Sequence, residues 1–205
     1  MKKLKQVFVI LTLVFLATAS AVAQTENIYV EKKECKNSFK GYKLVLNYKS
    51  DTVQQTSFTY GYDLNYFISL DESKKLLLIE ALLKYENDTS HCCMKIIGYS
   101  LNGNEGCRGV PKNVKQFTIQ VDALFMINRL CWPKLMELYS CSPVLYDTKL
   151  KKEINSNQEK IKCVFKDYEK WFEECKVKGK ITKYFPFNDG RYVWYGGRKS
   201  IAPKE

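Results

Sequence analysis

One histidine and eight cysteines are the side chains of this 205-residue sequence with the widest chemical range. Catalytic zinc sites often use three histidines and Cys₂His₂ sites use two, so the single His91 excludes both. No C-x-x-C pair occurs. In the run from His91 to Cys93, successive side chains would point about 100° apart on a helix, so they would not converge on one ion. The sequence predicts neither a metal nor another cofactor.

The cysteines are instead predicted to form disulfides, because their number is even and all of them follow a segment with the pattern of an export signal. Spacing does not identify the pairs, since eight cysteines allow about 105 pairings. The candidates are Cys35, Cys92, Cys93, Cys107, Cys131, Cys141, Cys163 and Cys175.

Motifs for nucleophilic catalysis are absent from the sequence, which has no G-x-S-x-G and no H-E-x-x-H. A cysteine nucleophile would need His91 as its base, and nothing selects one cysteine for that role. Paired carboxylates such as Asp63 with Asp71, or Glu80 with Glu86, leave glycoside chemistry open. The sequence therefore favours a non-enzymatic protein, and a hydrolase with a cysteine or carboxylate site is an alternative.

An aromatic and basic cluster near the C-terminus is the candidate ligand platform, because aromatic rings stack on sugars and arginine binds anions. It consists of Arg191, Tyr192, Trp194 and Tyr195. It predicts carbohydrate or anionic-ligand binding as an alternative function. In the competing interpretation, the same rings only pack against the helices.

Residues 1–23 have the three regions of a bacterial secretory signal peptide. These are an early cluster of lysines, an apolar run over 7–17, and Ala21-Val22-Ala23. The apolar run is shorter than the roughly 20 residues that span a bilayer. We expect a secreted or periplasmic protein with no transmembrane segment after cleavage.

The formal net charge of +11 does not predict a nucleic-acid partner, because most lysines and arginines are dispersed and interleaved with acids. The one local excess lies in 176–199. The expected partner is an unknown protein or a component of the cell envelope, reached through surface contacts.

Four regions are expected: the signal peptide, an irregular or β-containing segment over 24–68, a helical domain over 69–178, and a basic aromatic hairpin and tail over 179–205. Within the helical domain, Ser69–Glu72 and Ser156–Glu159 match capping boxes. Helices are also predicted over 90–101 and 114–132. The helix after residue 156 has an apolar stripe formed by Ile161, Val164, Phe165, Tyr168, Trp171, Phe172 and Cys175.

Successive helices that are apolar on several sides resemble α-solenoid units of the HEAT kind over 69–178. The resemblance rests on helix spacing and implies protein binding. The predicted fold is therefore mainly α, with packed helices resembling a HEAT-like solenoid fragment and a short aromatic β-hairpin at the C-terminus.

Overall fold

A first antiparallel sheet is formed by the N-terminal part of the chain in the computed structural model, which describes residues 27–36, 40–50, 55–58, 65–94, 96, 114, 116–132, 142–182, 184–187 and 189–195. Its strands are β1 (Asn27–Glu34), β2 (Tyr42–Lys49) and β3 (Thr56–Phe58), in the order β1-β2-β3. β2 is central and nearly continuous in burial, and Leu44, Leu46 and Tyr48 join the hydrophobic core.

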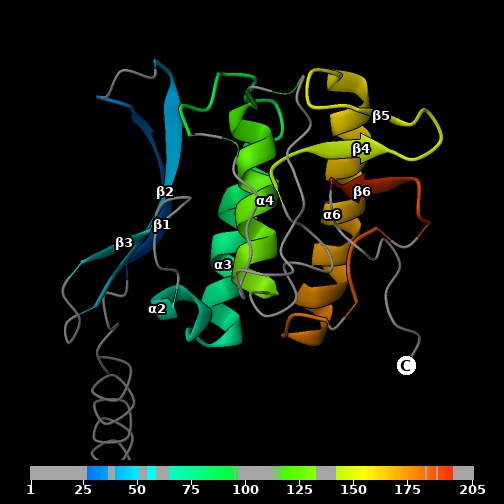
Figure 1. Ribbon diagram of the computed structural model, residues 1–205. Helices are drawn as coiled ribbons and strands as arrows, with labels where there is room; N and C mark the ends of the chain where they lie inside the picture. Colours follow the sequence, from blue (N-terminus) through cyan, green and yellow to red (C-terminus); the bar gives the residue numbers. More distant parts are fainter. Residues whose placement is uncertain are drawn as a thin grey trace, which may run out of the picture.

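Helices α2 (Asn65–Ile68), α3 (Glu72–Leu83), α4 (Ile119–Cys131) and α6 (Gln158–Lys178) lie on one side of this sheet (Figure 1). α4 contacts β2, α3 and α6, so it runs through the middle of the core. Every residue of α4 from Ile119 to Asn128 is buried, together with Leu130. This burial explains why most of the helix is apolar, although Gln120, Asp122 and Asn128 are buried with it.

A second antiparallel sheet joins parts of the chain that lie far apart in sequence. β4 (Leu145–Asp147) is central, with β5 (Lys152–Glu153) on one side and β6 (Tyr192–Trp194) on the other. Figure 1 shows this sheet beside α6, on the side away from the first sheet. Trp194 anchors it to the helices, because its ring packs 5.4 Å from that of Phe125 and its Nε1 donates to the Tyr168 hydroxyl at 2.9 Å.

The prediction of a mainly α, HEAT-like fold is wrong, since the described residues form a mixed α/β fold with two three-stranded sheets. The residues expected to form a helix over 90–101 include His91 and Cys92, which instead form β-bridges to Thr118 and Tyr42. The helix expected over 114–132 begins only at Ile119. The N-terminal segment, which was open between irregular and strand structure, contributes the whole first sheet.

The predicted C-terminal hairpin is also wrong. Residues 184–187 form no strand, and β6 pairs with β4 instead. Phe185 and Phe187 are buried in the core, where their rings pack 5.5–6.3 Å from that of Tyr168. Burial of these rings outweighs the local turn signal that favoured a hairpin.

The two capping boxes lie near real helix starts but are shifted. α3 is capped by Asp71, whose carboxylate accepts from the Lys74 amide at 2.9 Å. α6 is capped by Asn157, which accepts from the Lys160 amide at 3.1 Å. The predicted stripe of α6 is confirmed, since its seven residues are the buried residues of that helix.

The sequence predicted disulfides without selecting pairs, and the structure contains one, between Cys35 after β1 and Cys93, with Cα atoms 6.5 Å apart. Cys92, Cys131, Cys163 and Cys175 are free thiols, and Cys107 and Cys141 lie outside the described residues. None of the helices in the described part of the chain combines the length and hydropathy needed to cross a membrane.

Candidate functional site

A pocket of about 640 Å³ lies where three separate segments meet. The segments are 89–91, residues 114 and 116–118, and 153–156. Seven of the nine described lining residues have side chains with hydrogen-bonding groups. The lining consists of Thr89, His91, Val114, Gln116, Phe117, Thr118, Glu153, Asn155 and Ser156.

Three backbone hydrogen bonds hold the wall of the pocket that contains His91. The His91 carbonyl accepts from the Tyr42 amide at 2.9 Å, which ties the wall to the start of β2. The Cys92 amide donates to the Phe117 carbonyl at 2.9 Å, and the Ile119 amide donates to the Ser90 carbonyl at the same distance. The disulfide to Cys93 lies two residues beyond His91. This wall is therefore rigidly joined to both β2 and α4.

Gly41 is required next to this wall. Its φ of +136° is a backbone conformation that suits glycine, and a Cβ atom there would lie 2.6 Å from the His91 carbonyl oxygen. The close approach allows the Tyr42 amide to reach that carbonyl.

A charged contact holds the loop before His91. The Lys32 ammonium lies 2.6 Å from both the Asp88 carboxylate and the Ser90 hydroxyl. Burial raises the pKa of Asp88, but the hydrogen bonds from Lys32 and Ser90 outweigh this effect and lower the pKa below its usual value. Asp88 therefore stays ionised and keeps the loop attached to β1.

The opposite wall lies between β5 and α6. The Asn155 side chain accepts from the Leu145 amide at 2.8 Å and donates to the Pro143 carbonyl at 2.9 Å, so its orientation is fixed. The Glu153 carboxylate accepts from the Asn155 amide at 3.1 Å. These bonds place an acceptor-rich carboxylate on the pocket wall.

The hydroxyl of Thr118 is a buried polar group with an unmet hydrogen-bonding need. Thr118 is the N-cap residue of α4, yet its side chain makes no capping bond, and its Oγ1 is buried without a partner. A buried unsatisfied hydroxyl costs on the order of 1–3 kcal/mol.

The residues predicted as a ligand platform lie elsewhere, beside α6. Trp194 is 0% exposed and Tyr192 is 2% exposed, whereas Arg191 and Tyr195 are partly exposed. The Tyr192 ring is covered by cations of the chain itself, with the Arg191 guanidinium carbon 5.0 Å and the Lys160 nitrogen 6.0 Å from its centroid. The structure thus brings these residues together but leaves the faces of Tyr192 and Trp194 inside the protein.

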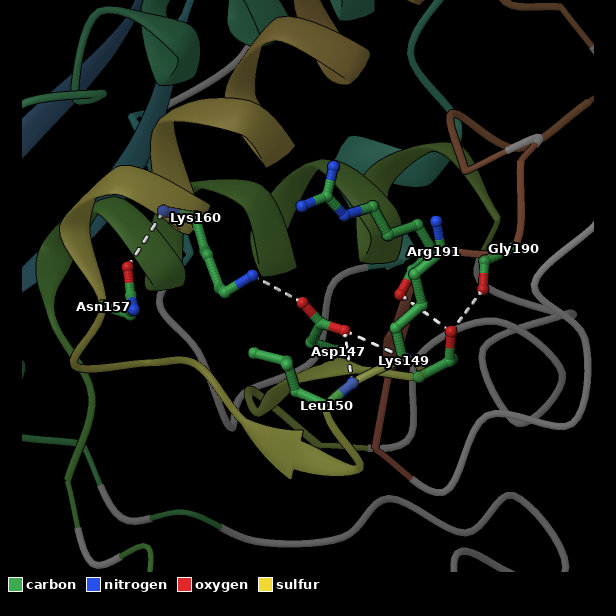
Figure 2. A network of polar contacts seen from close by, with 8 residues as sticks. Asp147, Lys149, Leu150, Asn157, Lys160, Gly190 and Arg191 are labelled. Carbon is green, nitrogen blue, oxygen red and sulfur yellow. Dashed lines mark hydrogen bonds and ion pairs between the residues drawn. The ribbon is translucent and has the colours of Figure 1, made fainter.

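The surroundings of Arg191 form a structural network, shown in Figure 2. Lys160 extends from α6 to the Asp147 carboxylate at 2.6 Å, and the Asp147 side chain also accepts from the amides of Lys149 and Leu150. These contacts outweigh burial and lower the pKa of Asp147. The network fastens the second sheet to α6.

Strand β6 joins the same network through the backbone of Arg191. The Thr148 hydroxyl donates to the carbonyls of Gly190 and Arg191 at 2.8 and 3.0 Å (Figure 2). The Arg191 amide donates to the Asp189 carboxylate at 2.9 Å, and the charge of Arg191 also acts on Asp167. Burial and the charge of Asp189 raise the pKa of Asp167 to about 6, whereas Arg191 lowers it.

The described cysteines that lie near His91 in the chain or are joined to that segment are not suited to act as nucleophiles. Cys35 and Cys93 are joined to each other, and burial raises the pKa of the Cys92 thiol far above its usual value. A buried thiol of this kind is a poor nucleophile. Among the described residues, no group of three or more His, Cys, Asp and Glu side chains is placed to hold a metal ion.

Sequence reasoning identified His91 but missed the rest of the pocket. The alternation of Gln116 and Thr118 with apolar residues was the one local signal, because it places both polar side chains on one side of an extended segment. Glu153, Asn155 and Ser156 lie in a polar connection with no motif. Comparisons with protein-family models, curated proteins and solved structures found no match to this chain.

Proposed function

We propose that this is an exported, non-enzymatic binding protein that holds a polar component of the cell envelope in the pocket beside His91. The single observation that carries the proposal is the pocket itself. Three segments meet around about 640 Å³, a volume within the range of about 300–1,000 Å³ typical of small-molecule sites, and seven of the nine described lining residues have hydrogen-bonding side chains.

Export is supported by two features. Residues 1–23 have the composition of a signal peptide, and Cys35 pairs with Cys93 in a disulfide that persists in oxidising compartments. A protein that is secreted or periplasmic would have this pocket next to components of the cell envelope.

Binding without turnover is favoured over catalysis because the described lining residues include one carboxylate. Most glycoside hydrolases use a pair of carboxylates, and Glu153 is the only acid among the described lining residues. The presence of His91 in the same pocket makes a hydrolase with a carboxylate site the second candidate. Release of reducing sugar from a bound oligosaccharide, abolished by His91→Gln, would favour that candidate.

The test uses the ring signals of His91, which are unique because the chain has no other histidine. Purified protein without residues 1–23 is titrated with cellotriose, trigalacturonate, the glucosamine trimer and dialanine, and the histidine carbon–proton resonances are followed by NMR. We expect at least one probe to shift the His91 signal in a saturable manner.

A matched pair of variants assigns the signal to the pocket. Ser156→Trp fills the pocket from an exposed lining position, whereas Glu159→Trp puts the same ring on an exposed position outside the lining. Binding should be lost in the first variant and retained in the second. Failure of all probes to shift His91 would refute the proposed function.

A further inference from the structure

We infer that Cys131 and Cys175 form a redox-sensitive dithiol, which a disulfide oxidant converts into a disulfide between the end of α4 and the last turns of α6. In the structure both are free thiols. The pair is separate from the pocket beside His91, because the 13 residues of α4 place Cys131 about 20 Å along the helix from Thr118. It is therefore independent of the proposed function.

The end of α4 packs against α6 through contacts on either side of Cys131. The Tyr168 hydroxyl of α6 donates to the Asn128 side-chain oxygen at 2.6 Å. The ring of Trp132 lies 5.2 Å from that of Trp171. Asn128 and Trp132 precede and follow Cys131 within one helical turn, so Cys131 lies on the part of α4 that faces α6.

Cys175 occupies the adjoining end of α6. It follows Trp171 by one turn on the buried stripe of that helix and is 0% exposed. The Thr182 amide donates to its Sγ atom at 3.4 Å, and the neighbouring Ile181 amide donates to the Glu72 carboxylate at 2.7 Å. Cys175 therefore lies at a junction between the end of α6 and the first turn of α3.

The Cys131 thiol lies at the same junction. Burial raises its pKa well above the usual value, the charge of Cys175 raises it further, and Lys75 and Glu72 of α3 act on it in opposite directions. Glu72 is also the residue that accepts from the Ile181 amide beside Cys175. Contacts from α3, α4 and α6 thus bring the two thiols together.

The other described free thiols are too far away to pair with either cysteine. Cys163 is exposed and lies about 18 Å along α6 from Cys175. Cys92 lies beside Asp122 in the first turn of α4, about 14 Å along the helix from Cys131. A disulfide joins Cα atoms at most about 7 Å apart. Among the described free thiols, Cys131 and Cys175 are therefore the one pair in a position to react.

Burial explains why the pair is reduced in the structure and needs an oxidant. It also raises the pKa of Cys175, although the hydrogen bonds from Thr182 lower that pKa in part. Thiols that stay protonated react slowly, because the thiolate is the attacking species. Cys131 is partly exposed as the last residue of α4, and helix ends fray, so an oxidant reaches it before Cys175.

The reaction consists of two thiol–disulfide exchanges. The Cys131 thiolate attacks one sulfur of a low-molecular-weight disulfide, and one thiolate of that oxidant leaves. The Cys175 thiolate then attacks the Cys131 sulfur of the mixed disulfide and displaces the second oxidant thiolate. Two electrons pass from the protein sulfurs to the oxidant, whose two thiolates take up the two protons that the cysteines release.

The test treats the native protein without residues 1–23 with dithiodipyridine, a small uncharged disulfide. Remaining thiols are blocked with N-ethylmaleimide, and the protein is digested without reduction. Trypsin leaves Cys131 in the peptide 130–134 and Cys175 in the peptide 171–176, and neither peptide has another cysteine. By mass spectrometry, we expect the free forms of both peptides to be lost and replaced by a joined form, which a reducing agent separates.

Single substitutions provide the controls. Cys131→Ser and Cys175→Ser should each abolish the joined peptide, whereas Cys163→Ser removes an exposed thiol of the same helix and should leave the yield unchanged. An unaltered circular dichroism spectrum would show that each variant is folded. Oxidation of the wild type in concentrated urea should give mixed pairings, because the fold no longer holds the two thiols together.

Three results would overturn the inference. The first is recovery of both peptides unlinked after Cys163 has reacted completely, and the second is capture of Cys131 mainly by a different cysteine. The third is an equal yield of the joined peptide from native and urea-unfolded protein. None of these results bears on binding in the pocket, so the dithiol and the proposed function can fail separately.

Discussion

Removal of the Cys35–Cys93 disulfide tests how the fold holds the pocket wall in place. The bond joins residues separated by 58 positions. In the chain-entropy relation, closing a loop of that length lowers the entropy of the unfolded chain by an amount equivalent to about 4 kcal/mol at room temperature. Domains of this size have unfolding free energies of about 5–15 kcal/mol. The double variant Cys35→Ser/Cys93→Ser should therefore lose a large share of its stability.

Urea unfolding followed by tryptophan fluorescence provides the assay, because Trp132, Trp171 and Trp194 are all buried. Cys163→Ser is the matched control, since Cys163 is an exposed free thiol on α6 and its loss should change stability by less than about 0.5 kcal/mol. A reducing agent should destabilise the wild type but not the double variant. A double variant within about 1 kcal/mol of the wild type would refute the reasoning.

Three further changes have defined outcomes. Burial raises the pKa of Asp122 from 3.8 to about 7, so the unfolded chain releases this proton at a lower pH than the native protein. The free energy of unfolding should therefore fall by up to about 4 kcal/mol as the pH rises from about 4 to about 7. In Asp122→Asn this dependence on pH should be weaker, as measured by urea midpoints at pH 5 and 8. Tyr168→Phe leaves the buried indole N–H of Trp194 without its acceptor and should cost about 2 kcal/mol in the same assay, and an unchanged midpoint would contradict the assigned bond. Gly41→Ala puts a side chain at a strained φ and in a clash with the His91 carbonyl. Thermal unfolding should therefore show a loss of stability of about 1–3 kcal/mol, and the His91 resonance should shift. A melting temperature equal to that of the wild type would show that the backbone relaxes freely at this position.

Local sequence patterns predicted helix α6 and the approximate starts of α3 and α6. The stripe of α6 recurs with the helical period within one continuous segment, so its buried face could be read before the partners were known. Gly179 ends that helix with a φ of +63°, as a glycine stop predicts. The starts of α3 and α6 were displaced by one or two residues, because Asp71 and Asn157 compete successfully with the nearby serines for the cap position.

Long-range pairing was not predictable from the same signals. β6 has the alternation of a strand, but its partner β4 lies more than 40 residues earlier, and the nearer segment over 184–187 was the expected partner instead. Buried contacts of Phe185 and Phe187 with Tyr168 decide this choice. Such contacts depend on where α6 lies, which no local window contains.

The sequence alone identified the amphipathic segments and contained none of the common catalytic motifs. It also indicated an oxidising location, which the cysteines need if they form disulfides. These properties depend on neighbouring residues or on composition. Only the tertiary structure selected Cys35 with Cys93 among the possible pairs and brought His91, Thr118 and Glu153 to one pocket. Burial of the core determines which distant segments meet, because the gain in apolar contact is a property of the whole packed chain.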